Sequence, residues 1–208
     1  MAEPAFSKSL FLRDVTIEIA RQRSAKVEGG DRDDRTDKLT FTVTLQNRSK
    51  TPYAGVKMKF YLFAQNILFP KRFKLLQVFE ASTDIDALKS AVITTPMVES
   101  MWDDTVQTFG DKYKGWIARF FAPDGTLLIE KSSSSFFTNT DKLPGLKEGD
   151  YYDKALDPIT KRTTLEQVIK LRDFEGVTHE FFGTAAVVEK AAQAQAFAGE
   201  RLRAAFGN

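Results

Sequence analysis

KYKGWIARFFAPDGTLLIEK, residues 112–131, consists of two apolar runs joined by Pro-Asp-Gly. Pro123 fixes φ at the start of a turn, the Asp124 side chain can accept a hydrogen bond from the nearby backbone, and Gly125 adopts a positive φ at little cost. The flanking residues include aromatic and β-branched side chains, which favour strands. The stretch therefore predicts an antiparallel β-hairpin, and it decides the fold class because similar strand patterns recur upstream.

Alternating apolar and polar residues before the hairpin predict further strands. The most regular run is residues 38–46, in which apolar side chains alternate with Thr. Residues 10–23 and 56–63 predict two more strands. Less regular candidates follow at residues 73–80 and 88–98. Roughly six to eight short strands with turns between them predict a mainly β fold, an immunoglobulin-like antiparallel β-sandwich, with a closed barrel as the alternative.

Large apolar side chains occupy both sets of alternating positions in residues 112–121, so the register of this strand needs an explanation. A β-bulge at Gly115 would shift the register by one residue. The shift would place Tyr113, Trp116, Ala118 and Phe120 inside and Lys112, Lys114 and Arg119 outside. The alternative is a strand covered on both faces, with C-terminal helices as the outer cover.

The sequence changes character after Ser132, and the boundary of the first predicted domain is placed shortly after this change, at residue 137. Residues 1–137 form the predicted sandwich. Residues 138–162 are rich in Asp, Gly and Pro and have no period, which is typical of a loop or linker. Residues 163–208 are predicted to be helical, because Thr163 and Glu166 fit a capping box and an Ala-rich stretch with a narrow apolar stripe follows.

Composition and motifs exclude several kinds of chemistry. The chain has 208 residues, no Cys and one His, so disulfides, thiolate chemistry and cysteine zinc sites are ruled out. His179 has no second His at metal-binding spacing, and no G-x-S-x-G, P-loop or dinucleotide motif is present. The acidic stretch 31–37 lacks the Gly and Glu of a calcium loop. We therefore expect no enzyme, no cofactor and no metal ion.

Charge is segregated along the chain. Residues 38–79 contain no Asp or Glu but many Lys and Arg, while acidic residues crowd on either side. If the strands of this stretch share a sheet, they form a basic face suited to an anionic glycan, a lipid head group or an acidic protein surface. The predicted binding residues are Lys57, Lys59, Tyr61, Lys71, Arg72 and Lys74. The alternative is that acidic loops balance these strands across the fold; complementary patches would also suit self-association.

The balance of charge and the apolar runs bear on partners and location. A net charge of +2 is too small for bulk attraction to nucleic acid, so none is expected as a partner. No apolar run approaches the length that spans a membrane, and the first 14 residues lack the features of a signal peptide. Two interpretations remain: a cytoplasmic protein, or an exported form in which Met1 and Ala2 replace a signal peptide.

Two stretches carry a resemblance to a known family. LTFTVTLQNRSKTPYAGVKMKFYLFA (39–64) and FGDKYKGWIARFFAPDGTLLIEKSSS (109–134) resemble the exported immunoglobulin-like β-sandwich proteins of Verrucomicrobia, which include outer-membrane members encoded beside type IV pilus-like genes. The resemblance covers residues 10–137 and is carried by a Thr-alternating strand, an Asn-Arg-Ser turn and a Tyr-x-Gly-Trp strand. It implies a location in the periplasm or outer membrane and no catalysis.

The function expected from these observations is that of a non-catalytic interaction or structural protein of the cell envelope or surface, within a type IV pilus-like assembly or an adhesion system. Its partners would be other envelope or pilus proteins, or a second copy of the chain. The alternative is a carbohydrate-binding module for anionic glycans, which would need a solvent-facing aromatic platform. Trp102, Trp116 and Tyr113 are the candidates for that platform.

Overall fold

The computed structural model describes residues 6–27, 35–103, 109–133, 135, 137–159, 196 and 200. The chain divides into two compact units, Met1–Ile159 and Thr160–Asn208, and every named element belongs to the first unit. These elements are α1 (Lys8–Asp14), β1 (Val15–Val27), β2 (Arg35–Asn47), β3 (Tyr53–Asn66), β4 (Phe73–Ile85), β5 (Ser90–Thr94), β6 (Val98–Asp103), β7 (Phe109–Phe121), β8 (Leu127–Ser132), the 3-10 helix η1 (Thr140–Gly145) and β9 (Tyr151–Tyr152).

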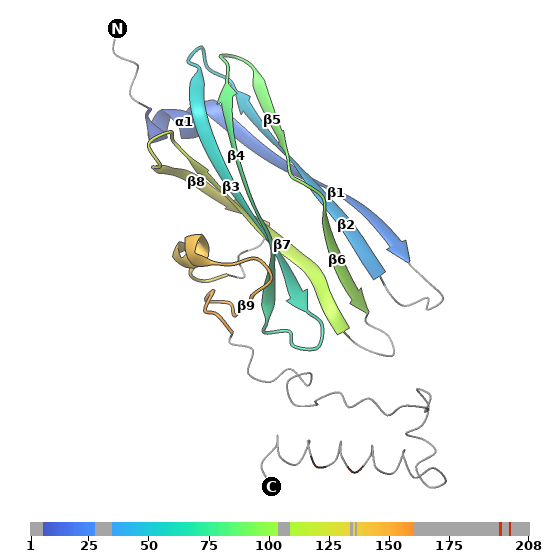
Figure 1. The fold of residues 1–208 in the computed structure, drawn as a ribbon. Helices are drawn as coiled ribbons and strands as arrows, with labels where there is room; N and C mark the ends of the chain where they lie inside the picture. The colour runs from blue at the N-terminus through green and yellow to red at the C-terminus, as the bar shows by residue number, and fades with distance from the viewer. Residues whose placement is uncertain are drawn as a thin grey trace. The chain divides into compact units, whose positions relative to one another are not determined.

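The strands form two antiparallel layers (Figure 1). β1 and β2 form one layer together with β5 and β6, which pair with successive parts of β2. β8, β7, β3, β4 and β9 form the other layer. β7 joins the layers, because its first residues pair with β6 and the rest pair with β3 and β8. The predicted mainly β, antiparallel sandwich is confirmed, and the described strands do not close into a barrel.

The main core lies between the two layers. Phe41 of β2 lies near its centre, with its ring centroid 5.1 Å from that of Phe60 in β3 and 6.0 Å from that of Tyr113 in β7. The apolar positions of the predicted alternations are all buried here: Leu39, Phe41, Val43, Leu45, Val56, Met58, Phe60 and Leu62. Period-2 patterning therefore identified the inner face of both strands correctly.

The beginning of the first strand differs from the prediction. Residues 8–14 form the helix α1, and β1 starts only at Val15. Phe11 is fully buried, with its ring 5.3 Å from that of Tyr53, whereas Leu10 and Leu12 on either side of it are exposed. Leu10, Phe11 and Leu12 form a short continuous apolar run in the sequence, and such a run does not distinguish a strand from a short helix with one buried anchor.

The β7–β8 hairpin forms as predicted. The Ala122 N–H donates to the Thr126 carbonyl at 2.9 Å, and the Gly125 N–H donates to the Ala122 carbonyl at 2.9 Å. Gly125 has a φ of 90°, and the Asp124 carboxylate accepts a hydrogen bond from the Thr126 N–H at 2.9 Å. Each turn residue thus has the role that its chemistry predicts.

Both explanations offered for the register of β7 hold in part. Phe63 pairs with Gly115 and Ala64 with Tyr113, so Lys114 is the extra residue of a bulge. Ala118 and Phe120 are buried in the main core, while Tyr113 and Trp116 pack against it. Arg119 points away from the main core as predicted, but it is buried on the outer face rather than exposed, with the residue 6% exposed. The outer face of β7 is covered as well.

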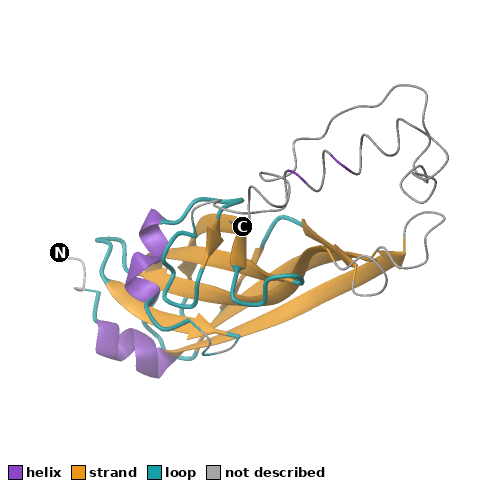
Figure 2. Ribbon diagram, turned by 90° about the horizontal axis from the view of Figure 1, so that it is seen from below, coloured by secondary structure: helices purple, strands orange, loops and turns teal. Residues whose placement is uncertain are grey.

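A second core covers the outer face of the β3–β4–β7 layer. Residues 137–159, which we call the covering segment, contribute four buried anchors to it: Phe137, Leu143, Tyr152 and Leu156. They pack on Tyr61, Phe63, Phe73, Leu75 and Ile117 of the layer. The segment expected to be a loop or linker is largely irregular, yet it is tightly packed; Figure 2 shows η1 and the adjoining loops beside the strands.

The predicted helical region, with its capping box and His179, lies outside the described residues except for Ala196 and Glu200, which are helical. The acidic residues 31–34 also lie outside them. Within the part of the chain that the structure describes, no helix has the length and apolar content needed to cross a bilayer.

Candidate binding surfaces

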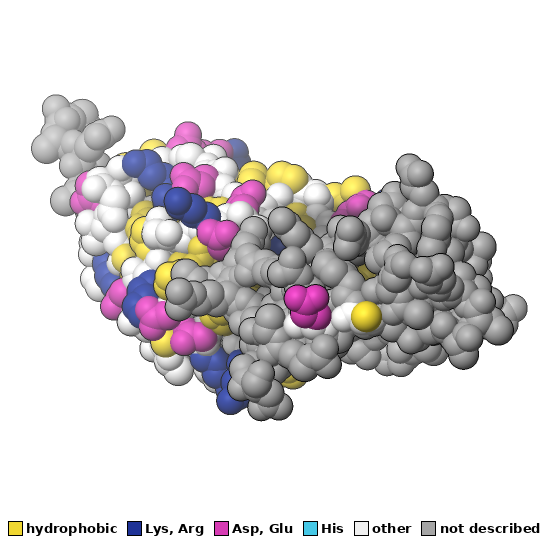
Figure 3. All heavy atoms as spheres, turned by 60° about the horizontal axis from the view of Figure 1, so that its bottom comes forward, with side chains coloured by type: hydrophobic (Ala, Val, Ile, Leu, Met, Phe, Trp, Pro, Cys, Tyr) yellow, Lys and Arg dark blue, Asp and Glu magenta, His cyan; other side chains and the backbone are white. Residues whose placement is uncertain are grey.

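The acid-free stretch 38–79 does not form one basic face. Its first strand, β2, lies in one layer, whereas β3 and β4 lie in the other. The chain crosses between layers in the β2–β3 turn, and this crossing divides the basic residues between two surfaces. Lys and Arg side chains are interspersed with Asp and Glu on the visible part of the described surface (Figure 3).

Lys57 and Lys59 lie on the outer face of β3 and are already engaged. Lys59 Nζ lies 2.7 Å from Glu80 Oε1, and this hydrogen bond raises the pKa of Lys59. Lys57 Nζ donates to the Pro123 carbonyl at 2.7 Å. Both line an open hollow of about 660 Å³. The expectation that Tyr61 adds an exposed aromatic ring to this face is wrong, because the covering segment buries Tyr61 to 2% exposure.

Lys71, Arg72 and Lys74 lie at the other end of the β3–β4 pair. Lys71 is exposed, and the Arg72 guanidinium lies 4.3 Å from the centroid of the Phe69 ring. Lys74 Nζ lies 3.2 Å from the carboxylate of Asp111 in β7. The six predicted residues therefore form two groups and a buried tyrosine, and acidic residues from other strands neutralise two of the lysines.

Asp111 fastens the covering segment to the sheet. Its carboxylate accepts hydrogen bonds from Asn66 Nδ2 at 2.9 Å and from the Tyr151 hydroxyl at 2.8 Å, besides pairing with Lys74. Burial and the hydrogen bond to Asp111 both raise the pKa of Tyr151. This network is structural, since all four groups are engaged with one another.

The strongest concentration of cations on aromatic rings surrounds Trp102, which sequence reasoning considered only as a glycan platform. In β6, Trp102 pairs with Arg35 of β2 and with Gly110 of β7. The Arg35 guanidinium lies 5.0 Å from the ring centroid and Lys112 Nζ lies 3.8 Å from it. Both cationic residues are exposed, whereas Trp102 is 2% exposed. Cation–π contacts with the buried indole ring therefore hold two positively charged groups at the surface.

Gly110 makes this arrangement possible. It has a φ of 90°, and a Cβ there would lie 2.4 Å from the Met101 carbonyl oxygen and 2.8 Å from the Trp102 Cα. Only glycine, which has no Cβ, allows β7 to approach β6 so closely at this position. The close approach brings Lys112, two residues further along, over the indole ring.

The same surface continues onto β1. The Arg21 guanidinium lies 5.0 Å from the centroid of the Tyr113 ring, and Arg23 Nη2 lies 2.8 Å from the buried carboxylate of Asp37. Burial raises the pKa of Tyr113. We call this set the Trp102 cluster; its members are Arg21, Arg23, Arg35, Asp37, Trp102, Lys112 and Tyr113. A signal was present in the sequence, because Arg21 and Arg23 continue the inward positions of Ile17 and Ile19 at two-residue spacing.

None of the three aromatic candidates for a glycan platform is fully exposed. Trp102 is buried, Trp116 is half-buried with its ring stacked 5.7 Å from that of Phe60, and Tyr113 is half-buried beside Phe41. The indole Nε1–H of Trp102 is buried and has no acceptor among the described residues. The carbohydrate-binding alternative therefore stays a prediction without an exposed aromatic platform.

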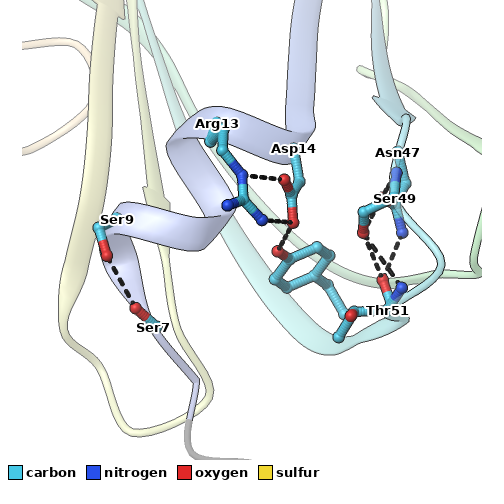
Figure 4. Close-up of polar contacts among 8 residues, drawn as sticks. Ser7, Ser9, Arg13, Asp14, Asn47, Ser49 and Thr51 are labelled. Atoms are coloured by element: carbon cyan, nitrogen blue, oxygen red, sulfur yellow. Dashed lines mark hydrogen bonds and ion pairs between the residues drawn. The ribbon is translucent and has the colours of Figure 1, made fainter.

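A polar network joins α1 to the β2–β3 turn (Figure 4). The Asp14 carboxylate accepts a hydrogen bond from Arg13 Nε and another from the Tyr53 hydroxyl, each at 2.8 Å. The hydrogen bond from Arg13 lowers the pKa of Asp14, and burial together with Asp14 raises the pKa of Tyr53 to about 12. Asn47 Nδ2 donates to the Thr51 carbonyl at 2.8 Å.

We expect Tyr53 to contribute to alkaline unfolding. Because its pKa is about 12 in the folded chain and about 10 when unfolded, its contribution is fully present below pH 10 and is lost as the pH rises towards 12. Tyr53→Phe should cost about 1 kcal/mol near pH 7. The difference from wild type, measured by denaturant unfolding, should shrink between pH 10 and 12; a constant difference would contradict this assignment.

Comparisons with solved structures found distant likenesses only. No family model matches the chain, and no curated protein matches it. A crystal structure of a protein from Akkermansia muciniphila superposes with a TM-score of 0.34 at 11% identity, covering 64% of this chain and 78% of that one. Beta-glucuronidase 2 of Bacteroides uniformis gives 0.32 at 9% identity, covering 66% of this chain and 13% of that one. A GH3 beta-glucosidase of Bifidobacterium adolescentis gives 0.24 at 14% identity, covering 87% and 21%.

Proposed function

We propose that this chain is a non-catalytic interaction module of the bacterial cell envelope or surface, and that the Trp102 cluster is its contact for an acidic partner. The observation that supports this proposal best is the seating of Arg35 and Lys112, both exposed, on one buried indole ring. Cations already held in place lose less conformational freedom on binding than free side chains do.

The chemistry of the cluster suits carboxylates on a protein surface. Arginine presents a planar set of donors that binds a carboxylate with two parallel hydrogen bonds. Arg21, Arg35 and Lys112 are exposed, and the carboxylate of Asp37 is engaged by Arg23. Four of the seven members of the cluster are basic and one is acidic, a balance of residue types that suits an acidic partner. The resemblance in sequence suggests that this partner is another protein of a type IV pilus-like assembly or an adhesion system.

The test compares two pairs of cations. Arg35→Gln with Lys112→Met removes both charges from the cluster but keeps aliphatic cover over Trp102. Lys57→Gln with Lys71→Met makes the same change on the face predicted from sequence. Poly-L-glutamate is the probe, with binding followed by tryptophan fluorescence at low salt. The first pair should weaken binding at least tenfold, and the second should leave it within about twofold.

Two outcomes would count against the proposal. If the Lys57/Lys71 pair weakens binding and the Arg35/Lys112 pair does not, the basic face predicted from sequence is the site. If wild type binds polygalacturonate but not poly-L-glutamate, and the Arg35/Lys112 pair abolishes this binding, the carbohydrate-binding alternative replaces the proposal.

A further inference from the structure

Three exposed leucines lie at the end of the sandwich that carries α1, the β2–β3 turn and the β4–β5 turn. Leu10 and Leu12 of α1 are 42% and 46% exposed, and Leu88 in the β4–β5 turn is 64% exposed. Large apolar side chains at this exposure leave much of their apolar surface in water. They lie on two elements distant in sequence that meet at this end of the sandwich, and exposed apolar side chains that share one end mark a candidate contact surface.

Hydrogen bonds hold these elements together as one unit. The Leu88 N–H donates to the Ser49 carbonyl at 3.0 Å, and the Asn47 N–H donates to the Lys89 carbonyl at 2.9 Å, so the two turns are joined directly. The Arg48 N–H donates to the Asp14 carbonyl at 2.8 Å, which attaches the end of α1 to the same turn. The three leucines therefore lie on elements whose relative positions are fixed by backbone hydrogen bonds.

Leu88 occupies an unusual backbone conformation. Its φ is 59°, in the left-handed region that glycine and asparagine adopt far more readily than leucine does. A strained backbone at a position where the side chain makes little packing contact points to a role outside the fold. This conformation makes Leu88→Gly a useful test, because the substitution removes the exposed side chain and at the same time relieves the backbone strain.

Cations surround the leucines. The basic residues on the same three elements are Lys8, Arg13, Arg48, Lys50 and Lys89, and all five are exposed. Their acidic neighbours are Asp14, Asp84, Asp86 and Asp124, the last in the β7–β8 turn, where Pro123 lies beside Gly55. Asp14 pairs with Arg13, and Asp86 pairs with Lys89, each with oxygen and nitrogen 2.8–2.9 Å apart. Asp84 accepts a hydrogen bond from the Gly55 N–H. The balance of charge at this end is positive.

We propose that this end of the sandwich, which we call the leucine tip, docks on an anionic membrane surface. Leu10, Leu12 and Leu88 would enter the interface between head groups and acyl chains, while Arg48 and Lys50 face lipid phosphates. Apolar side chains with basic neighbours are the combination that interfacial binding requires. Protein interfaces rely instead on aromatic and arginine anchors packed in pockets, and exposed leucines contribute little there. The proposal is independent of the Trp102 cluster.

The test is flotation of the full chain with phosphatidylcholine vesicles, with and without phosphatidylglycerol. Wild type should float with the vesicles that contain phosphatidylglycerol and should dissociate from them at high salt. Leu88→Gly should lower the partition coefficient roughly tenfold, since one buried leucine is lost, while its melting temperature equals or exceeds that of wild type. Arg48→Glu with Lys50→Glu should lower the partition coefficient by at least the same factor.

The matched control lies at the opposite end of the strands. Leu68, in the β3–β4 turn, is 50% exposed and has Lys71 and Arg72 nearby in sequence, so it offers similar chemistry. Leu68→Gly should leave flotation unchanged. The proposal is overturned if wild type does not float, if it binds neutral vesicles equally well, if Leu88→Gly floats like wild type, or if Leu68→Gly causes the same loss.

Discussion

Phe63→Ala should lower the free energy of unfolding by about 3–5 kcal/mol and should loosen residues 137–159 selectively. Phe63 is fully buried in the second core, with its ring centroid 4.4 Å from that of Phe137. The covering segment has little regular secondary structure, and much of its attachment comes from four apolar anchors that pack on this face. A cavity beneath Phe137 therefore removes packing that the segment does not replace elsewhere.

The control is Phe60→Ala, three residues earlier on the same strand. Phe60 is equally buried but belongs to the main core, where its ring packs on Phe41. Both substitutions should cost similar free energy in denaturant unfolding. Hydrogen exchange distinguishes the two variants under conditions where both are folded. The amides of Leu143 and Tyr152 should exchange faster than in wild type in Phe63→Ala, and at the wild-type rate in Phe60→Ala. Equal exchange in the two variants would show that the covering segment does not depend on this contact.

The sequence predicted the main core and the hairpin well because those features depend on local chemistry. The alternation in β2 and β3 assigns one face of each strand to the interior, and the turn at Pro123, Asp124 and Gly125 needs only those residues. The bulge in β7 was also recognisable in the sequence, because large apolar side chains at both odd and even positions required a change of register.

The outer cover of the sheet could not be predicted in the same way. Alternation assigns residues to faces, but it does not say what lies against each face. Tyr61 and Arg119 point away from the main core as expected, yet both are buried. The covering segment packs on Tyr61, and its Asp141 lies 3.8 Å from the Arg119 guanidinium. The anchors of that segment, from Phe137 to Leu156, follow neither a helical nor a strand period. Periodicity therefore gave no indication that this segment packs.

The candidate binding surface was misplaced for a related reason. Counting charges along residues 38–79 treats sequence neighbours as spatial neighbours, whereas β2 and β3 lie in different layers. The Trp102 cluster draws on β1, β2, β6 and β7, so its members, such as Arg21 and Lys112, are far apart in sequence. Only the strand pairing brings Arg35, Trp102 and Gly110 into one row.

Charged residues of four neighbouring strands form a row across the outer face of the β4–β3–β7–β8 layer. Lys59 pairs in register with Glu80 of β4 and with Arg119 of β7, and Arg119 pairs with Glu130 of β8. Arg119 Nε lies 2.6 Å from Glu130 Oε2, and the arginine side chain is only 7% exposed. Glu130→Leu should cost about 3 kcal/mol, because it leaves a buried guanidinium beside the positive charge of Lys59, with only the exposed carboxylate of Asp141, 3.8 Å away, as counter-charge.

The double variant Arg119→Met with Glu130→Leu should recover most of this loss. With both charges replaced by apolar side chains of similar length, neither an unpaired guanidinium nor its desolvation remains, and the free energy of unfolding should return to within about 1 kcal/mol of wild type. Arg119→Met alone should cost less than Glu130→Leu, since Glu130 is 28% exposed and can be hydrated. Denaturant unfolding of all four proteins gives the coupling energy directly. Additive single losses would show that Arg119 and Glu130 are not coupled and would contradict this assignment.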